Sequence, residues 1–236
     1  MNELPAYIGL VFIATTIATV GFIYFGIQST EKKKENKVAL TVLIVICTWL
    51  ALTGFLAYNG FYRNYEAIPP RLVFVFGPTL LSTFILLLIK KSRAFLLKVP
   101  ITTLTYLHIV RVPVEMVLWW LALNKALPLM LTFEGINHDI LSGVSAPFVA
   151  IFLVGINRYH RITAIIWNFV ALGLLFNIVG HALLSAPTPF QKFSFEQPMI
   201  AVFYLPYIWL PAFIVPAVFF SHLVSLMQLF SNQKER

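Results

Sequence analysis

Residues 101–124 read ITTLTYLHIVRVPVEMVLWWLALN, a run that is apolar apart from His108, Arg111 and Glu115. About 20 mostly apolar residues are enough for a helix to cross the hydrocarbon core of a bilayer. Ionisable side chains inside a membrane are costly and usually face the interior of a helix bundle or a watered cavity. We therefore predict a membrane-spanning helix over residues 100–123 whose polar face is turned toward other helices.

The composition of the whole chain also indicates a membrane protein. Of its 236 residues, 59% are apolar and 11% are charged, whereas a soluble domain has about 25% charged residues. The mean hydropathy is +0.85. These values exclude a water-soluble globule, because so apolar a chain has too few polar groups to cover a surface in water. Cys47 is the only cysteine, so the chain forms no internal disulfide.

Runs without charge that are long enough to cross a bilayer occur six more times along the chain. Together with the run at 101–124 they predict a single all-α integral membrane domain over residues 1–236, with no linker. The seven predicted membrane-spanning helices cover residues 5–29, 38–60, 71–91, 100–123, 139–157, 162–185 and 198–229.

The basic residues predict the orientation, because short cytoplasmic loops are enriched in lysine and arginine. With the N-terminus outside and the C-terminus in the cytoplasm, twelve basic residues lie inside: Lys32, Lys33, Lys34, Lys37, Lys90, Lys91, Arg93, Lys98, Arg158, Arg161, Lys234 and Arg236. Four then lie outside: Arg63, Arg71, Lys125 and Lys192. We expect a protein of the plasma or inner membrane, with the lipid bilayer as its partner.

The net charge of +8 does not indicate a nucleic-acid partner, because the basic residues form short clusters between apolar runs and no continuous basic face. The densest cluster is EKKKENK at residues 31–37. It is interpreted as a cytoplasmic turn that fixes the topology. A patch for anionic lipid is the alternative.

The polar residues of the helix at 100–123 share one face. His108, Arg111 and Glu115 are spaced i, i+3 and i+7, and Trp119 extends the same stripe. One interpretation is an ion pair between Arg111 and Glu115, four residues apart, that holds the helix in place. The other is a stripe that faces a ligand pocket.

The helix at 162–185 has a second polar face, formed by Asn177 and His181 and flanked by Gly173 and Gly180. Small residues let a neighbouring helix approach closely. At 1.5 Å per residue, Asn177 lies about 22 Å into its helix and Glu115 about 21 Å into its own. Because Asn177 and Glu115 lie at similar depth, they are predicted to line one pocket between the two helices. The alternative is a packing contact between these helices without a pocket.

Further candidates lie at the outer end of the predicted bundle. Tyr204 and Tyr207 stand in the outer third of the last helix, which also carries three prolines that should kink it and free backbone carbonyls. The segments 124–139 and 186–198 are expected to close over an outward-facing site. Its predicted mouth is formed by Glu134, His138 and Asp139.

A metal site at this mouth is a weaker alternative. Glu134, His138, Asp139 and His181 include residue types that bind zinc, but they form no compact motif such as H-E-x-x-H. Asp139 is better interpreted as the N-cap of the helix that follows it. A retinal protein is excluded, because residues 198–229 contain no lysine for a Schiff base.

Two functions are consistent with these patterns. In the first, an outward-facing intramembrane pocket binds, transports or processes a small polar or anionic molecule, with Arg111 as the fixed positive charge. In the second, the protein is a structural or accessory membrane subunit whose polar residues only specify helix packing. The sequence assigns no cofactor, reaction or oligomeric state.

The topology predicts which sites can be labelled in intact cells. An accessibility tag at residue 34 or 95 should react only after the membrane is permeabilised, and a tag at residue 128 or 192 should react from outside. Labelling of residue 95 in intact cells would overturn the arrangement of seven helices.

Overall fold

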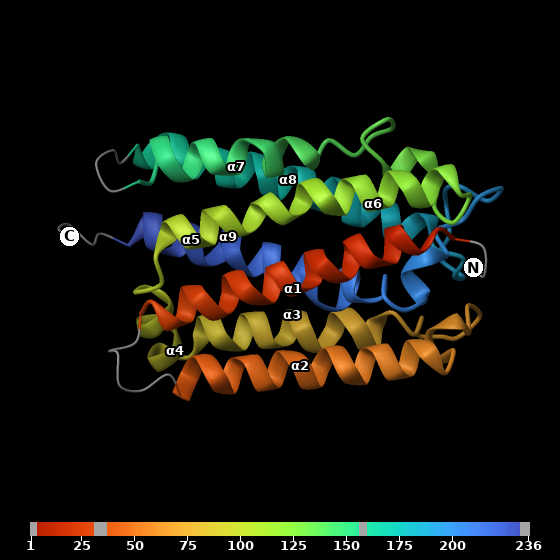
Figure 1. The fold of residues 1–236 in the computed structure, drawn as a ribbon, viewed down its shortest axis with the longest axis horizontal. Helices are drawn as coiled ribbons and strands as arrows, with labels where there is room; N and C mark the ends of the chain where they lie inside the picture. The colour runs from red at the N-terminus through yellow and green to blue at the C-terminus, as the bar shows by residue number, and fades with distance from the viewer. Residues whose placement is uncertain (1–3, 31–36, 156–159, 232–236) are drawn as a thin grey trace.

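Helices account for most of the described part of the chain, which comprises residues 4–30, 37–155 and 160–231 of a computed structural model. The α-helices are α1 (Ala6–Gln28), α2 (Lys37–Tyr58), α3 (Val73–Leu88), α4 (Lys90–Leu96), α5 (Ile101–Leu107), α6 (Arg111–Leu123), α7 (Ile140–Phe152), α8 (Arg161–Ser185) and α9 (Val215–Phe230). Short turns of helix are η1 (Phe61–Arg63), η2 (His108–Val110), η3 (Leu129–Leu131), η4 (Ala201–Phe203) and the π-helical η5 (Leu210–Ile214). The long helices run along one axis, and α1 begins at the end opposite to the end of α9 (Figure 1).

Among the described residues, five helical stretches are long and apolar enough to cross a membrane, which confirms the predicted helical architecture of membrane character for this part of the chain. They are α1, α2, the continuous stretch Ile101–Leu123, α8 and Leu210–Phe230. A sixth span results if α3 and α4, which meet at an angle of 89°, are counted as one. At 13 residues α7 is shorter, and a helix of that length extends for about 20 Å.

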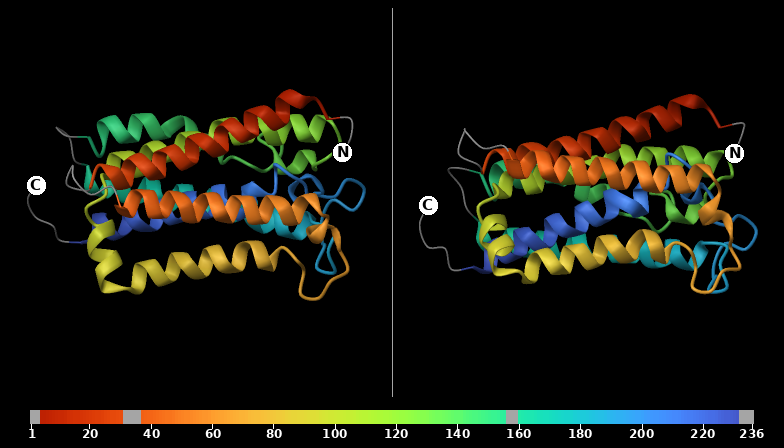
Figure 2. Two further views of the ribbon diagram at one scale, coloured as in Figure 1. Left: turned by 60° about the horizontal axis from the view of Figure 1, so that its bottom comes forward. Right: turned by 90° about the horizontal axis from the view of Figure 1, so that it is seen from below.

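Three predicted helices have different boundaries in the structure. The helix expected over 71–91 ends at Leu88, and α4 then turns across the end of the bundle (Figure 2). Lys90 and Lys91 begin α4, so the bend keeps their charges out of the apolar part of the bundle. The helix expected over 139–157 ends at Phe152, where the amides of Leu153 and Val154 both donate to the Val149 carbonyl.

The helix expected over 198–229 begins only at Leu210. Residues 198–209 contain the turn η4 and Pro206, and a proline has no N–H with which to extend a helix. Of the remaining predictions, residues 156–157 and residues 31–36 of the EKKKENK run lie outside the described part of the chain.

Trp49 of α2 donates a hydrogen bond to a backbone carbonyl that Pro216 leaves without its helical partner. Pro216 cannot donate to the Ala212 carbonyl four residues before it, and that oxygen accepts a hydrogen bond of 2.9 Å from Trp49 Nε1. In the opposite direction, Trp209 Nε1 donates to the Leu50 carbonyl at 2.9 Å. The carbonyl that the proline frees therefore has a partner inside the bundle. The two bonds join α2 to η5 and to Trp209, the residue just before η5.

The stretch Ile101–Leu123 lies at the centre of the bundle, where α5 contacts α1, α7 and α9, and α6 contacts α1 and α7. Gly143 of α7 permits the close approach to α6, because a Cβ atom there would lie 2.9 Å from Val112 Cγ2 and 3.1 Å from Arg111 Cβ. Gly173 and Gly180 do not have the expected packing role, since a Cβ atom at either would meet nothing within 4 Å.

The two classes of glycine predict opposite responses to alanine. Gly143→Ala should lower the free energy of unfolding by about 1–3 kcal/mol, because the new methyl group overpacks the contact between α7 and α6. Gly173→Ala is the control, and it should leave stability unchanged or raise it by up to about 1 kcal/mol through helix propensity. Equilibrium unfolding in mixed detergent micelles measures both. Equal stability of the two variants would contradict the close approach at Gly143.

Candidate functional site

A buried guanidinium stands at the start of α6. Arg111 is 2% exposed, and its Nη1 atom forms an ion pair of 2.8 Å with Asp139 Oδ1. Its Nη2 atom lies 3.0 Å from His222 Nε2 on α9. Because arginine carries only donors, His222 Nε2 must accept this bond. The ring is therefore neutral, and its protonated Nδ1 donates to Asn168 Oδ1 of α8 at 2.8 Å.

The ion pair differs from the one that the helix spacing suggested. Among the described residues, Arg111 pairs with Asp139 across two elements and not with Glu115 on its own helix. Gly143 brings the first turn of α7 against Arg111, and Asp139 lies at the N-cap position of that helix. Its carboxylate makes no capping bond to α7, because it is committed to Arg111.

Asn137 joins the second carboxyl group to this network. Its Nδ2 atom donates to Glu115 Oε1 at 2.6 Å and to the Leu131 carbonyl at 3.1 Å. Its Oδ1 atom accepts the backbone N–H of Asp139 at 3.1 Å. Glu115 is 2% exposed, yet its Oε2 atom has no hydrogen-bond partner in the described structure. One oxygen of a buried carboxyl group thus remains available.

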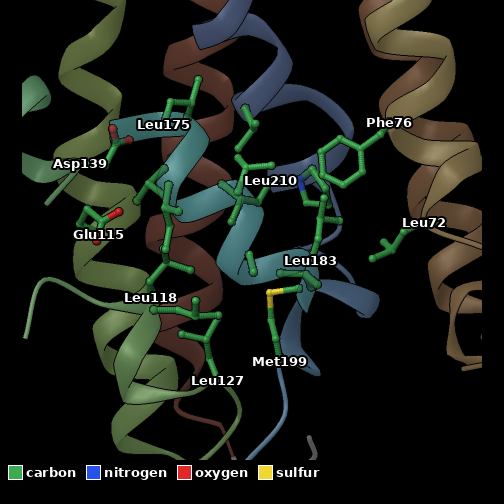
Figure 3. A pocket seen from close by; sticks show the side chains of 18 residues that line it. Leu72, Phe76, Glu115, Leu118, Leu127, Asp139, Leu175, Leu183, Met199 and Leu210 are labelled. Atoms are coloured by element: carbon green, nitrogen blue, oxygen red, sulfur yellow. The ribbon is translucent and has the colours of Figure 1, made fainter. Parts of the chain in front are cut away.

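This free oxygen belongs to a residue that lines a pocket. Eighteen residues line the pocket, and sixteen of them are apolar. The other two are Glu115 and Asp139, which lie together on one side, while Phe76 of α3 and Leu72, the residue before α3, lie on the opposite side (Figure 3). Leucines of α6, α8 and the segment before η3 form much of the wall between them. The pocket is apolar, with carboxyl groups at one end.

His108 and Arg111 are buried and Trp119 is half-buried, and none of the three lines this pocket. The His108 ring stacks on His222, with centroids 3.9 Å apart. Both His108 nitrogens lack a partner in the described structure, as does Trp119 Nε1. Of the residues on the predicted stripe, only Glu115 lines the pocket.

The residues predicted on the facing helix lie elsewhere. Asn177 is exposed and donates to the Ile136 carbonyl at 3.0 Å, so it holds the loop before α7. His181 Nδ1 lies 2.8 Å from the Asn177 carbonyl. The His181 ring stacks on Phe193, with centroids 5.5 Å apart. Equal depth therefore did not bring Asn177 or His181 onto the pocket wall.

Tyr204 and Tyr207 do not line this pocket, but both line a separate one, together with Pro5 and Gly9. The Arg63 guanidinium lies 5.1 Å from the centroid of the Tyr204 ring. Burial, together with the neighbouring Tyr204, raises the pKa of Tyr65 to about 12. Tyr207 is buried against Phe12 of α1, with ring centroids 5.4 Å apart. Both tyrosines pack segments at the N-terminal end of the bundle.

Of the predicted mouth residues, only Asp139 lines the pocket, and Glu134 and His138 are exposed. Within the described residues no three His, Cys, Asp or Glu side chains gather where they could hold a metal ion. The candidates Glu134, His138, Asp139 and His181 are therefore not brought together.

Sequence reasoning did not select three members of the network: Asn137, Asn168 and His222. His222 is the only histidine in the predicted last helix, and a lone ionisable residue in an apolar run is itself a signal of a buried partner. Asn137 gave a weaker signal, since it lies in a loop sequence where asparagine is common.

A family model described as "Domain of unknown function (DUF8737)" matches residues 68–230, which is more than half of the chain. The chain belongs to this family. The matched region contains the buried network and the pocket, whereas α1 and α2 lie before it. Comparison with curated proteins and with solved structures gives no match.

The ion pair predicts strong coupling between Arg111 and Asp139. Arg111→Met or Asp139→Asn alone should lower the free energy of unfolding by about 3–5 kcal/mol, because each leaves a buried charge without its partner. The double variant should lose clearly less than the sum of the two. Equilibrium unfolding of the four proteins gives the coupling energy.

A second cycle is the matched comparison. Arg111→Met combined with Glu115→Gln should give a smaller coupling energy, since Glu115 bonds to Asn137 instead. A larger coupling for Glu115 than for Asp139 would contradict the assigned pair.

Proposed function

We propose that the chain crosses the membrane seven times, with its N-terminus outside and its C-terminus in the cytoplasm. The α3–α4 pair serves as the third crossing, and α7 with the turn after it as the fifth. Successive long helices alternate in direction along the bundle, which can be followed in Figure 1. The basic residues of α4 support the orientation, because they lie at the bundle end where α9 finishes.

We further propose that the pocket binds a small molecule with an apolar body and a hydrogen-bond donor, such as an ammonium or hydroxyl group. The observation that carries this proposal is the unpartnered Oε2 atom of Glu115 at the end of an apolar pocket. An unsatisfied buried carboxyl oxygen is costly, and a donor on the ligand would satisfy it. Binding is the step that transport, sensing and catalysis have in common.

The local charges support a cationic or neutral donor over an anion. Arg111 carries the one positive charge of the network, while Asp139 and Glu115 are two carboxyl groups. With both ionised, the site has one uncompensated negative charge in a medium of low dielectric. Arg111 is enclosed by Asp139 and His222 and is absent from the pocket wall. We therefore propose a ligand with a cationic or neutral hydrogen-bond donor in place of the anionic ligand that Arg111 suggested in the sequence.

A purely structural role explains part of the network. The bonds from Asn168 through His222 to Arg111 and Asp139 join α8, α9, α6 and the start of α7, and they would specify the packing of an accessory subunit. They do not explain why the Glu115 carboxyl faces an apolar pocket with a free oxygen. Structural carboxyl groups in a core normally have partners.

Photolabelling of the full chain in lipid vesicles tests the proposal. The probes are an octylamine and an octanoic acid that carry the same diazirine. The amine should label peptides that contain pocket residues such as Leu118 or Met199, and the acid should label them weakly. Glu115→Gln should reduce labelling by the amine about tenfold, which corresponds to the loss of one hydrogen bond to a charged group.

Glu134→Gln is the matched control, because Glu134 is an exposed glutamate outside the pocket. It should leave labelling by the amine unchanged. Equal labelling by the acid, or equal effects of the two Glu→Gln changes, would count against the proposed ligand.

A further inference from the structure

The apolar end of the pocket lies between α3 and α8. Both helices pack on the last helical segment of the chain. Helix α3 contacts both η5 and α9, and α8 contacts α9. The pocket takes Phe76 from α3, Leu72 from the position just before it, and Val179 and Leu183 from α8. Leu210 of η5 also lines the pocket (Figure 3). This end of the pocket is therefore formed by two helices that flank a third.

The most exposed of these lining residues stands at the α8 side of the apolar end. Glu115, Asp139 and Leu72 are buried, Phe76 and Val179 are half-buried, and Leu183 is 42% exposed. The α8 surface beside this end is itself apolar, with Phe176 exposed one turn before Val179 and Gly180. An apolar surface of this kind on a helix suited to cross a membrane faces hydrocarbon.

The loop end of the pocket is covered instead. Leu127 and Leu131 line the pocket there, and each is 1% exposed. The two loops that meet over it are hydrogen-bonded to each other, because Gln197 Nε2 donates to the Leu127 carbonyl at 2.6 Å and the Ala201 amide to the Ala126 carbonyl at 3.0 Å. A ligand from water would have to displace this cover.

We infer that the pocket is entered sideways from the bilayer, between α3 and α8, and that its ligand is a long-chain amphiphile with an amine or hydroxyl head. The head reaches Glu115, while the hydrocarbon chain passes Phe76 and Leu183 into the lipid. This inference rests on the proposed function, since it assigns both a class of ligand and a route to the same site. It requires no movement of the loops that cover the other end.

Membrane entry is tested with a hexadecylamine that carries a diazirine in its chain, in vesicles that contain the full-length protein. The amount of probe is held constant while the amount of lipid is increased. Labelling of the pocket peptides should fall as the probe-to-lipid ratio falls. At equal content in the bilayer, hexadecylamine should label the pocket at about the same initial rate as octylamine, because entry from the membrane depends on the bilayer concentration. A rate that is orders of magnitude slower for hexadecylamine would contradict entry from the membrane, since each of its eight extra methylene groups favours the bilayer over water by about 0.8 kcal/mol and so lowers its aqueous concentration.

Two tryptophan variants of α8 test the sideways route itself. Leu183→Trp places a large side chain at the lip and should slow labelling by hexadecylamine several-fold. Phe176→Trp is the matched control, because Phe176 is exposed on the same helix and does not line the pocket. If Leu183→Trp fails to fold, Leu183→Ala replaces it and should speed labelling by widening the lip.

The results separate the two proposals. If octylamine labels the pocket in a manner that depends on Glu115, but the Leu183 and Phe176 variants label at the same rate, the sideways route is wrong and the proposed function stands. If neither amine depends on Glu115, both are wrong.

Discussion

The guanidinium of Arg111 has to be neutralised inside a helix bundle, and the positions of its neighbours follow from that requirement. A buried arginine is tolerated when its charge is paired and most of its donors are bonded. Asp139 supplies the charge and His222 an acceptor, so the start of α7 and the middle of α9 converge on one turn of α6. Gly143 provides the space for this convergence.

The same pairing leaves Glu115 in an unusual position. Had Asp139 capped α7, Arg111 would have needed the carboxylate of Glu115, four residues along its own helix. Because Asp139 meets Arg111, Glu115 is bonded on one oxygen only, to Asn137. The other oxygen stands at the end of an apolar pocket. The proposed ligand site is thus a consequence of how the buried positive charge is satisfied.

The membrane character and most helices could be predicted from the sequence, because apolar length is a local property. The bend after Leu88 and the late start at Leu210 could not be placed from apolar length alone, since lysines and prolines shorten helices that apolar runs would continue.

The site was predicted only in part. Helix spacing put His108, Arg111 and Glu115 on one stripe, and all three are buried in the structure, whereas Asn177 and His181, which equal depth selected, do not line the pocket. Depth along two helices does not determine how each helix is rotated about its axis. Asn168 and His222 join the Arg111 network through packing between helices that are far apart in the sequence. The periodicity of a single helix carries no information about such contacts.

Infrared difference spectroscopy of the vesicle-embedded protein, with and without hexadecylamine, tests most directly whether the Glu115 carboxyl receives the ligand's donor. The amine should shift a carboxyl band of the unchanged protein, and this shift should be absent in Glu115→Gln. A Glu115→Gln protein that retains the same band shift would contradict this role of Glu115.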